Sequence, residues 1–97
     1  MNADQNRGNK MQVLNRPRQN GPYRDRDIGC QEALEQSFLT LAELHSGEVL
    51  DAAAGKLSST LMALAKRAES VGWTLEEAEV AISELAQNLL DENTGHG

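Results

Sequence analysis

The chain of 97 residues is poor in aromatic side chains, with one Trp, one Tyr and one Phe, and it has two prolines and one cysteine. Its core therefore has to be built from Leu, Ala, Val, Ile and Met. A single cysteine, Cys30, cannot form a disulfide within the chain, which fits a reducing compartment. One core in a domain of this size supplies only about 3–5 kcal/mol, and oligomerisation is a common remedy. We therefore expect a thin aliphatic core and a homo-oligomer.

Long hydrophobic runs are absent as well. No window approaches the roughly 18 consecutive apolar residues of a membrane span. The start of the chain also lacks the apolar region of a signal peptide. An arginine-rich, acid-poor start leaves a transit peptide as an alternative, although no amphipathic run supports it. We expect no membrane contact and a cytoplasmic location.

The net charge of −6 hides two segments of opposite sign. Residues 1–26 carry six basic and two acidic side chains, a net charge of +4, whereas residues 27–97 carry three and thirteen, a net charge of −10. Because Pro17 and Pro22 interrupt any helix and the first segment has no apolar face, we predict a flexible basic arm over residues 1–26. A helical body over residues 27–92 and a frayed tail over residues 93–97 follow.

Two interpretations of this arm stay open. It is either a solvated tail folded loosely over the acidic body, or a tether that binds phosphates or an acidic protein surface. Tyr23 could stack on a base in the second case. The candidate contacts with an anion or a nucleic acid are Arg7, Lys10, Arg16, Arg18, Arg24 and Arg26.

Apolar spacing predicts three helices, at about residues 28–46, 48–71 and 74–91. Asp27 is the expected N-cap of the first helix, and Gly47 is its expected terminator. The third helix opens with a capping box, in which Thr74 and Glu77 satisfy each other's backbone N–H groups. Trp73, just before that box, is expected to pack as a lid across the junction of the second and third helices, or else to anchor a partner.

The second helix has the most regular pattern, because its apolar residues alternate steps of four and three in a heptad seam. We predict one continuous helix, with Gly55 on its outer face. The alternative is a break at Gly55, with Ser58 or Ser59 capping a new helix. The seam residues expected to carry self-association or partner binding are Leu50, Leu57, Leu61, Leu64 and Val71. Apolar residues off the seams, as candidates for a partner face, are Leu39, Met62, Trp73 and Val80.

Patterns that would carry catalysis or metal binding are absent from the sequence. Cys30 and His45 lie fifteen residues apart, about 22 Å along a helix, so they cannot meet within one chain. Neither metal-ligand spacing nor a glycine-rich phosphate loop occurs. We expect a protein that is not an enzyme and that needs no cofactor or metal.

The stretch with Ala68, Gly72, Thr74 and Ala78 resembles the turn of a DNA-binding helix-turn-helix. The resemblance implies that the helix after the turn would read base edges. Glu76, Glu77 and Glu79 would then meet phosphates, and their charges argue against that role.

These patterns predict an all-α protein, either a small three-helix bundle or a helical hairpin with a long central helix, behind a disordered arm and assembled as a homodimer. The predicted function is that of a non-catalytic regulatory or adaptor protein, which acts by helix-mediated protein–protein interaction. The alternative is a nucleic-acid-associated regulator that uses the basic arm on a helical dimer.

Overall fold

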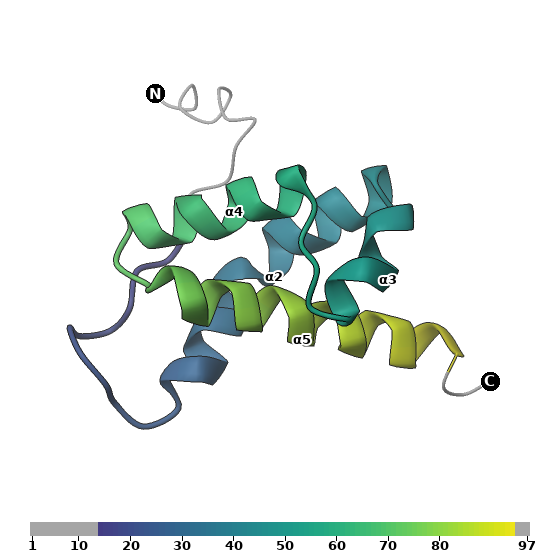
Figure 1. Ribbon diagram of the computed structural model, residues 1–97. Coiled ribbons are helices and arrows are strands. Elements are labelled where there is room, and N and C mark those ends of the chain that lie inside the picture. Colours follow the sequence, from purple (N-terminus) through teal and green to yellow (C-terminus); the bar gives the residue numbers. More distant parts are fainter. Residues whose placement is uncertain (1–13, 95–97) are drawn as a thin grey trace, which may run out of the picture.

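Four helices form the part of the chain that the structure describes, residues 14–94 of a computed structural model (Figure 1). They are α2 (Arg26–Leu44), α3 (Gly47–Ala53), α4 (Ser59–Ser70) and α5 (Leu75–Thr94), with no strand between them. The prediction of an all-helical fold is confirmed. Across these residues, a search for a helix with the length and hydropathy of a membrane span finds none.

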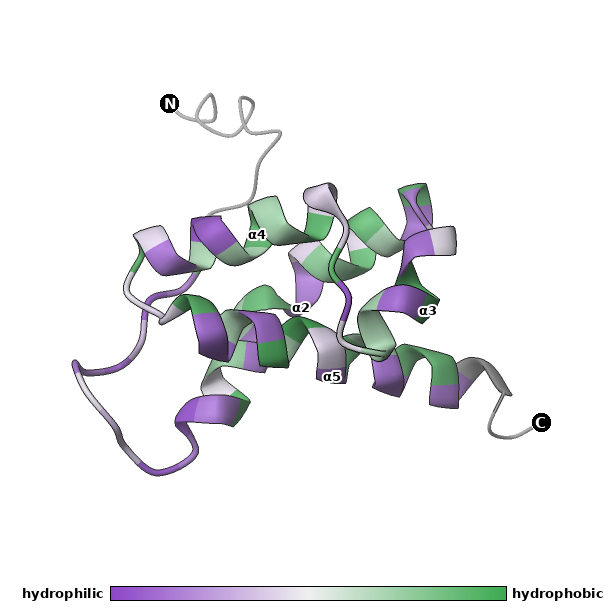
Figure 2. Cartoon of the chain, in the orientation of Figure 1, coloured by the Kyte–Doolittle hydropathy of each residue, from purple (hydrophilic) through white to green (hydrophobic). Residues whose placement is uncertain are grey.

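The central helix of the fold is α5, which packs against each of the other three. Its apolar residues recur at steps of three and four, which places Ala78, Ile82 and Leu85 in the core. α2 and α4 add the other large core residues, among them Leu34 and Phe38, which are fully buried. Figure 2 shows hydrophobic and hydrophilic residues alternating around each helix, as expected where one face is buried. The core is largely aliphatic, as the composition requires.

The continuous helix predicted over residues 48–71 is wrong, because the structure divides it into α3 and α4. Gly55 has a φ of +93° and lies just past the end of α3. The Gly55 N–H donates to the Ala52 carbonyl at 2.9 Å and the Lys56 N–H donates to the Asp51 carbonyl at 2.9 Å, the bonds of a Schellman motif. Ser58 then caps α4, since its side chain accepts from the Leu61 N–H at 3.2 Å. The predicted alternative, a break at Gly55 with a serine cap, is the one observed.

The heptad seam fails in its first half for the same reason. Residues spaced alternately by four and three lie on one face only while the helix continues. The turn at Gly55 ends α3, so the residues before it no longer share a face with those after it. In α3 the buried residues are Val49 and Ala52, whereas Leu50, the first residue of the seam, is 67% exposed. In α4 the seam holds, and Leu61 and Leu64 are buried.

The turn between α4 and α5 repeats the Schellman geometry. Gly72, with a φ of +123°, donates to the Glu69 carbonyl, and Trp73 donates to the Ala68 carbonyl. The capping box follows and is confirmed: the Glu77 N–H donates to Thr74 Oγ1 at 3.0 Å, and the Thr74 N–H donates to Glu77 Oε2 at 2.7 Å. α5 extends three residues beyond the predicted end at residue 91, to Thr94.

Both ends of α2 differ from the prediction. The helix begins at Arg26, and Asp25, rather than Asp27, occupies the N-cap position in a left-handed conformation. It ends at Leu44, and Gly47 begins α3 instead of terminating α2. A left-handed glycine is not needed there, because Ser46 keeps helical dihedrals and the chain bends directly into the next helix.

Residues 14–25, named the strap here, differ from the predicted flexible arm. Leu14 is buried, and the Trp73 indole N–H donates to the Asn15 carbonyl at 2.8 Å. Pro17 lies so close to Gly72 that a Cβ on that glycine would be 3.0 Å from the proline Cδ. The strap is therefore packed on the α4–α5 turn. The remaining arm residues, 1–13, and the last three of the tail, 95–97, lie outside the described residues.

Candidate protein-interaction groove

α2 and α5 run side by side in the same direction. At their starts, Arg26 of α2 meets Glu77 of α5. Next, the side-chain amide of Gln31, in the second turn of α2, donates to the carboxylate of Glu84, near the middle of α5. Farther along, Phe38 lines the same depression as Leu85 and Leu89. The line of contact between the two helices is therefore bordered along its whole length by side chains from both.

The C-terminal half of this contact is hollowed. A cavity of about 380 Å³ lies among the ends of α2, α3 and α5, and a smaller one of about 120 Å³ adjoins it. Leu39 and Leu89 line both cavities, so the two lie next to each other. We call their combined lining the α2–α5 groove; it consists of Glu35, Phe38, Leu39, Ala42, Glu43, Ser46, Val49, Leu85, Asn88, Leu89, Leu90 and Glu92.

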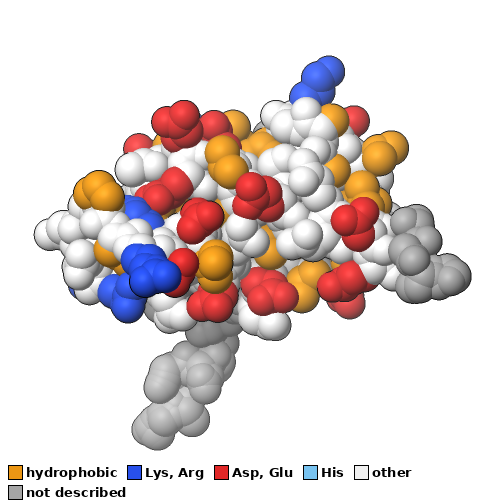
Figure 3. Space-filling model, turned by 90° about the horizontal axis from the view of Figure 1, so that it is seen from below, with side chains coloured by type: hydrophobic (Ala, Val, Ile, Leu, Met, Phe, Trp, Pro, Cys, Tyr) orange, Lys and Arg blue, Asp and Glu red, His pale blue; other side chains and the backbone are white. Residues whose placement is uncertain are grey.

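Leucines form the floor of the groove and carboxylates its rim. Leu39, Leu89 and Leu90 are each only partly buried, although they pack against the core. Glu35, Glu43 and Glu92 are exposed around them, and the described residues of the lining include no lysine, arginine or histidine. The surface in Figure 3 shows the same mixture, with acidic and hydrophobic side chains interspersed and the basic ones gathered mainly at one end.

The N-terminal half of the contact is closed by an ion pair. Arg26 Nη2 lies 2.7 Å from Glu77 Oε2, and Arg26 Nε donates to both Glu77 oxygens at 2.9 and 3.1 Å. The two side chains are 14% and 20% exposed. Hydrogen bonds from Arg26, with a smaller contribution from the Thr74 N–H, lower the pKa of Glu77, and the same pairing raises the pKa of Arg26.

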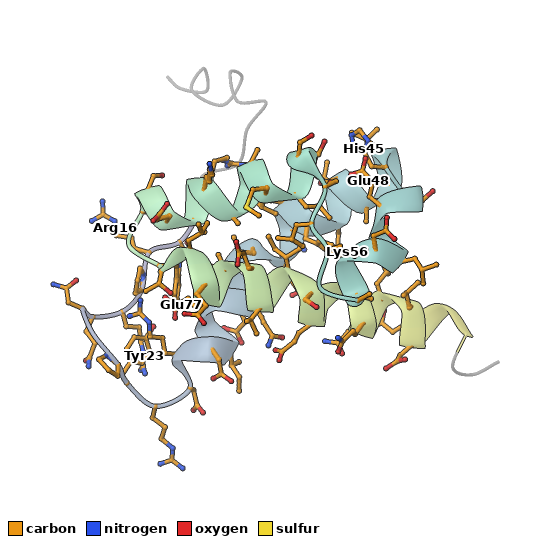
Figure 4. All side chains as sticks on the ribbon, in the orientation of Figure 1. Arg16, Tyr23, His45, Glu48, Lys56 and Glu77 are labelled. Atoms are coloured by element: carbon orange, nitrogen blue, oxygen red, sulfur yellow. The ribbon has the colours of Figure 1, made fainter. Side chains whose placement is uncertain are left out.

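The Arg26–Glu77 pair also joins the strap to the body. The Arg26 guanidinium lies over the rings of Tyr23 and Trp73, at 5.6 and 5.1 Å from their centroids, and donates to the Gly21 carbonyl at 3.0 Å. Figure 4 shows Tyr23 and Glu77 at this end of the molecule, and His45 and Glu48 at the other. A shallower depression of about 260 Å³ beside the pair is bordered by Glu76, Val80 and Glu84.

The predicted seam residues do not form one surface. Leu61 and Leu64 are buried in the core of the single chain, and Leu57 and Val71 are half-buried against it. Leu50 alone is exposed, because it belongs to α3 and not to a continuation of α4. The seam therefore serves packing within the chain.

The predicted partner-face residues divide among three environments. Leu39 lines the α2–α5 groove, and Val80, 50% exposed, borders the shallower depression. Met62 is half-buried against the core. Trp73 is only 3% exposed and donates to the Asn15 carbonyl, so it is buried beneath the strap and has no exposed surface that could anchor a partner. Leu89 and Leu90, which were not among the predicted partner-face residues, also line the groove.

The predicted anion contacts are likewise dispersed. Arg7 and Lys10 lie outside the described residues. Arg26 is paired with Glu77, and Arg18 lies over the Tyr23 ring at 4.5 Å. Arg16 and Arg24 are exposed. A cavity of about 420 Å³ between the strap and α2 is lined by both charges: Asn15, Arg16, Arg18, Tyr23, Asp25, Ile28, Gly29, Glu32, Ala33 and Trp73.

Cys30 and His45 do not form a common site. Cys30 is fully buried, and desolvation raises the pKa of its thiol to about 12. His45 is exposed at the α2–α3 corner, with its Nδ1 3.6 Å from a Glu48 oxygen. Within residues 14–92, no group of three or more His, Cys, Asp or Glu side chains is arranged to hold a metal ion.

Comparison of the chain with protein-family models, with curated proteins and with solved structures gives no match.

Proposed function

We propose that this chain is a non-catalytic regulatory or adaptor protein that binds another protein through the α2–α5 groove. The observation that supports this proposal is an open apolar floor of three leucines on two neighbouring helices. Fully burying a leucine side chain contributes about 1.5–3 kcal/mol. Because Leu39, Leu89 and Leu90 already bury most of their surface, a partner that covers them would gain at most about 0.5–1 kcal/mol from each.

Grooves between helices are a recurring site for an amphipathic partner segment. The apolar floor also lies where the helices are not covered by the strap. The seam on α4 faces inward, whereas the groove and the exposed residues Ile28, Leu44, Leu50 and Val80 are apolar features available to a partner. A homodimer, if one forms, would use these surfaces and not the seam.

Site-specific photocross-linking tests the proposal. A photoreactive amino acid at Glu43, on the rim, is compared with one at Glu69, an exposed glutamate of α4 outside the groove. Both are placed in the full chain, in cells that produce it naturally. We expect an adduct with another protein from position 43 only, and we expect Leu39→Ala to reduce it. Equal adducts from both positions, or none from position 43, would refute the proposal.

The alternative function, a nucleic-acid-associated regulator, has one favourable observation. Arg16 and Arg24 are exposed, and Arg16 lines the cavity beside the strap. Asp25 and Glu32 line the same cavity, so its charge is mixed. Binding of a single-stranded oligonucleotide that weakens steeply with salt, and weakens further in Arg16→Ala, would support it. Salt-independent or absent binding would exclude it.

A further inference from the structure

The α2–α5 groove is an elongated apolar surface. Its floor is built from two neighbouring helices, a setting in which an amphipathic partner helix can dock. The two adjoining cavities, of about 380 and 120 Å³, extend from the start of α3 to the middle of α5. A segment that spans both would bury Leu39 and Leu89 together.

The acidic rim of the groove favours a partner helix with basic residues beside its apolar stripe. Glu35 and Glu92 border the smaller cavity and Glu43 borders the larger, and no cation is found among the described residues that line either one. Residues 27–97 as a whole carry three basic and thirteen acidic side chains. An occupant with acidic flanks would meet like charges, whereas lysines or arginines beside an apolar stripe would pair with the rim.

The same charges argue against two other occupants. A second copy that pairs by two-fold symmetry would place each rim glutamate near its own copies. Arg26 and Arg18 lie at the other end of the two helices and are already engaged, Arg26 with Glu77 and Arg18 with Tyr23. An anionic membrane surface would be repelled by the rim as well.

We infer that the α2–α5 groove binds a cationic amphipathic α-helix of a partner protein, with the apolar stripe on Leu39, Leu89 and Leu90 and the cationic flanks on Glu35, Glu43 and Glu92. This inference rests on the proposed function, since it names the partner segment of the same groove.

Designed peptides of about 18 residues, five helical turns, test the inference against the full-length protein. One has a leucine stripe flanked by lysines, the second has glutamates in place of the lysines, and the third is a scramble of the first that keeps its charge without the stripe. Binding is followed by fluorescence anisotropy at low and physiological salt. We expect the first peptide to bind at least about tenfold more tightly than either of the others, and to weaken as salt screens the rim.

Matched variants locate the binding. The triple variant Glu35→Gln, Glu43→Gln, Glu92→Gln should lower the affinity about tenfold, because exposed ion pairs are individually weak but three are removed together. A control with the same loss of charge outside the groove, Glu32→Gln, Asp51→Asn, Glu69→Gln, should change it less than about twofold. Circular dichroism checks that each variant is folded.

Three results would overturn the inference: equal binding of the acidic peptide, equal losses in the two triple variants, or a concentration-dependent dimer that Leu39→Ala dissolves. The proposed function fails separately. A position-43 adduct with a protein that lacks a cationic helix would keep the groove as the binding site and reject only this partner chemistry, whereas loss of that adduct would reject the groove function itself.

Discussion

Replacing Glu77 with glutamine tests how the start of α5 is held. The Glu77 carboxylate accepts three hydrogen bonds from Arg26 and one from the Thr74 N–H. Loss of an N-terminal cap costs about 1 kcal/mol. Loss of a charge-assisted hydrogen-bond partner costs a further 1.5–3 kcal/mol, approximately, when the groups are largely buried. Since glutamine keeps one acceptor oxygen, we expect Glu77→Gln to lower the free energy of unfolding by about 2–3 kcal/mol.

Glu76→Gln is the matched control, because Glu76 lies in the same first turn and is exposed. It loses only its interaction with the helix dipole, about 0.3–0.5 kcal/mol. Urea denaturation at pH 7, followed by circular dichroism, measures both values. A change of 2–3 kcal/mol in a domain this small corresponds to a lowering of the melting temperature by roughly 10–20 °C. Similar losses in the two variants would refute the structural argument.

The pH dependence of this difference has a defined sign. The pKa of Glu77 is lowered in the folded chain from its ordinary value of 4.5, so its contribution to stability is complete above about pH 5. It is lost as pH falls through the folded-state pKa, where the wild-type side chain becomes neutral like glutamine. The gap between wild type and Glu77→Gln should therefore close in acid. A gap that is unchanged between pH 7 and pH 3 would contradict the assignment.

Three further outcomes follow from the turns and the buried thiol. Gly55→Ala should destabilise the chain by about 1–2 kcal/mol, because alanine would have to adopt a left-handed φ. If the helix were continuous through this position, the same change would stabilise it by about 1 kcal/mol. Urea denaturation distinguishes the two cases by the sign of the change in the free energy of unfolding. Gly72→Ala should cost more than Gly55→Ala, because its Cβ would also press on Pro17; equal losses would mean that the strap does not pack there. Cys30 should react with a thiol reagent at pH 8 only as fast as the chain unfolds. Burial blocks access to the thiol, and a pKa of about 12 lowers the fraction of thiolate roughly a thousandfold. Rapid labelling of the native protein would contradict this prediction.

Features set by neighbouring residues could be predicted from the sequence. The Thr74–Glu77 capping box needs only residues three apart, and it is present as predicted. The apolar stripe of α5 likewise follows from helical spacing, because one helix face meets the rest of the fold. The break at Gly55 was harder to predict. The uninterrupted apolar period favours one continuous helix through that position, whereas a glycine that can adopt a left-handed φ favours a helix end there.

Features set by distant residues could not be predicted. Trp73 lies 58 positions from Asn15, and the hydrogen bond between them holds the strap. Nothing in the local composition of residues 14–25 distinguishes a packed segment from a free one. The α2–α5 groove depends similarly on the way two helices separated by about 30 residues lie together. Leu39 was singled out because it lies off the stripe of α2, but its neighbours Leu89 and Leu90 could be placed beside it only from the structure.

The strap also changes the reason to expect a partner. The sequence favoured self-association because the core was thin, but Leu14 and the covered Trp73 add to the core at the N-terminal end of α5. At the C-terminal end, no segment among residues 14–92 covers Leu39 and Leu89 in the same way. A bound helix would do there what the strap does at the other end. A ligand at a hundred times its Kd raises the free energy of unfolding by about 2.7 kcal/mol, so binding of a helix in the groove should raise the melting temperature. We expect Leu39→Ala to diminish this rise. Leu44→Ala, which changes an exposed leucine outside the groove, should leave the rise in place.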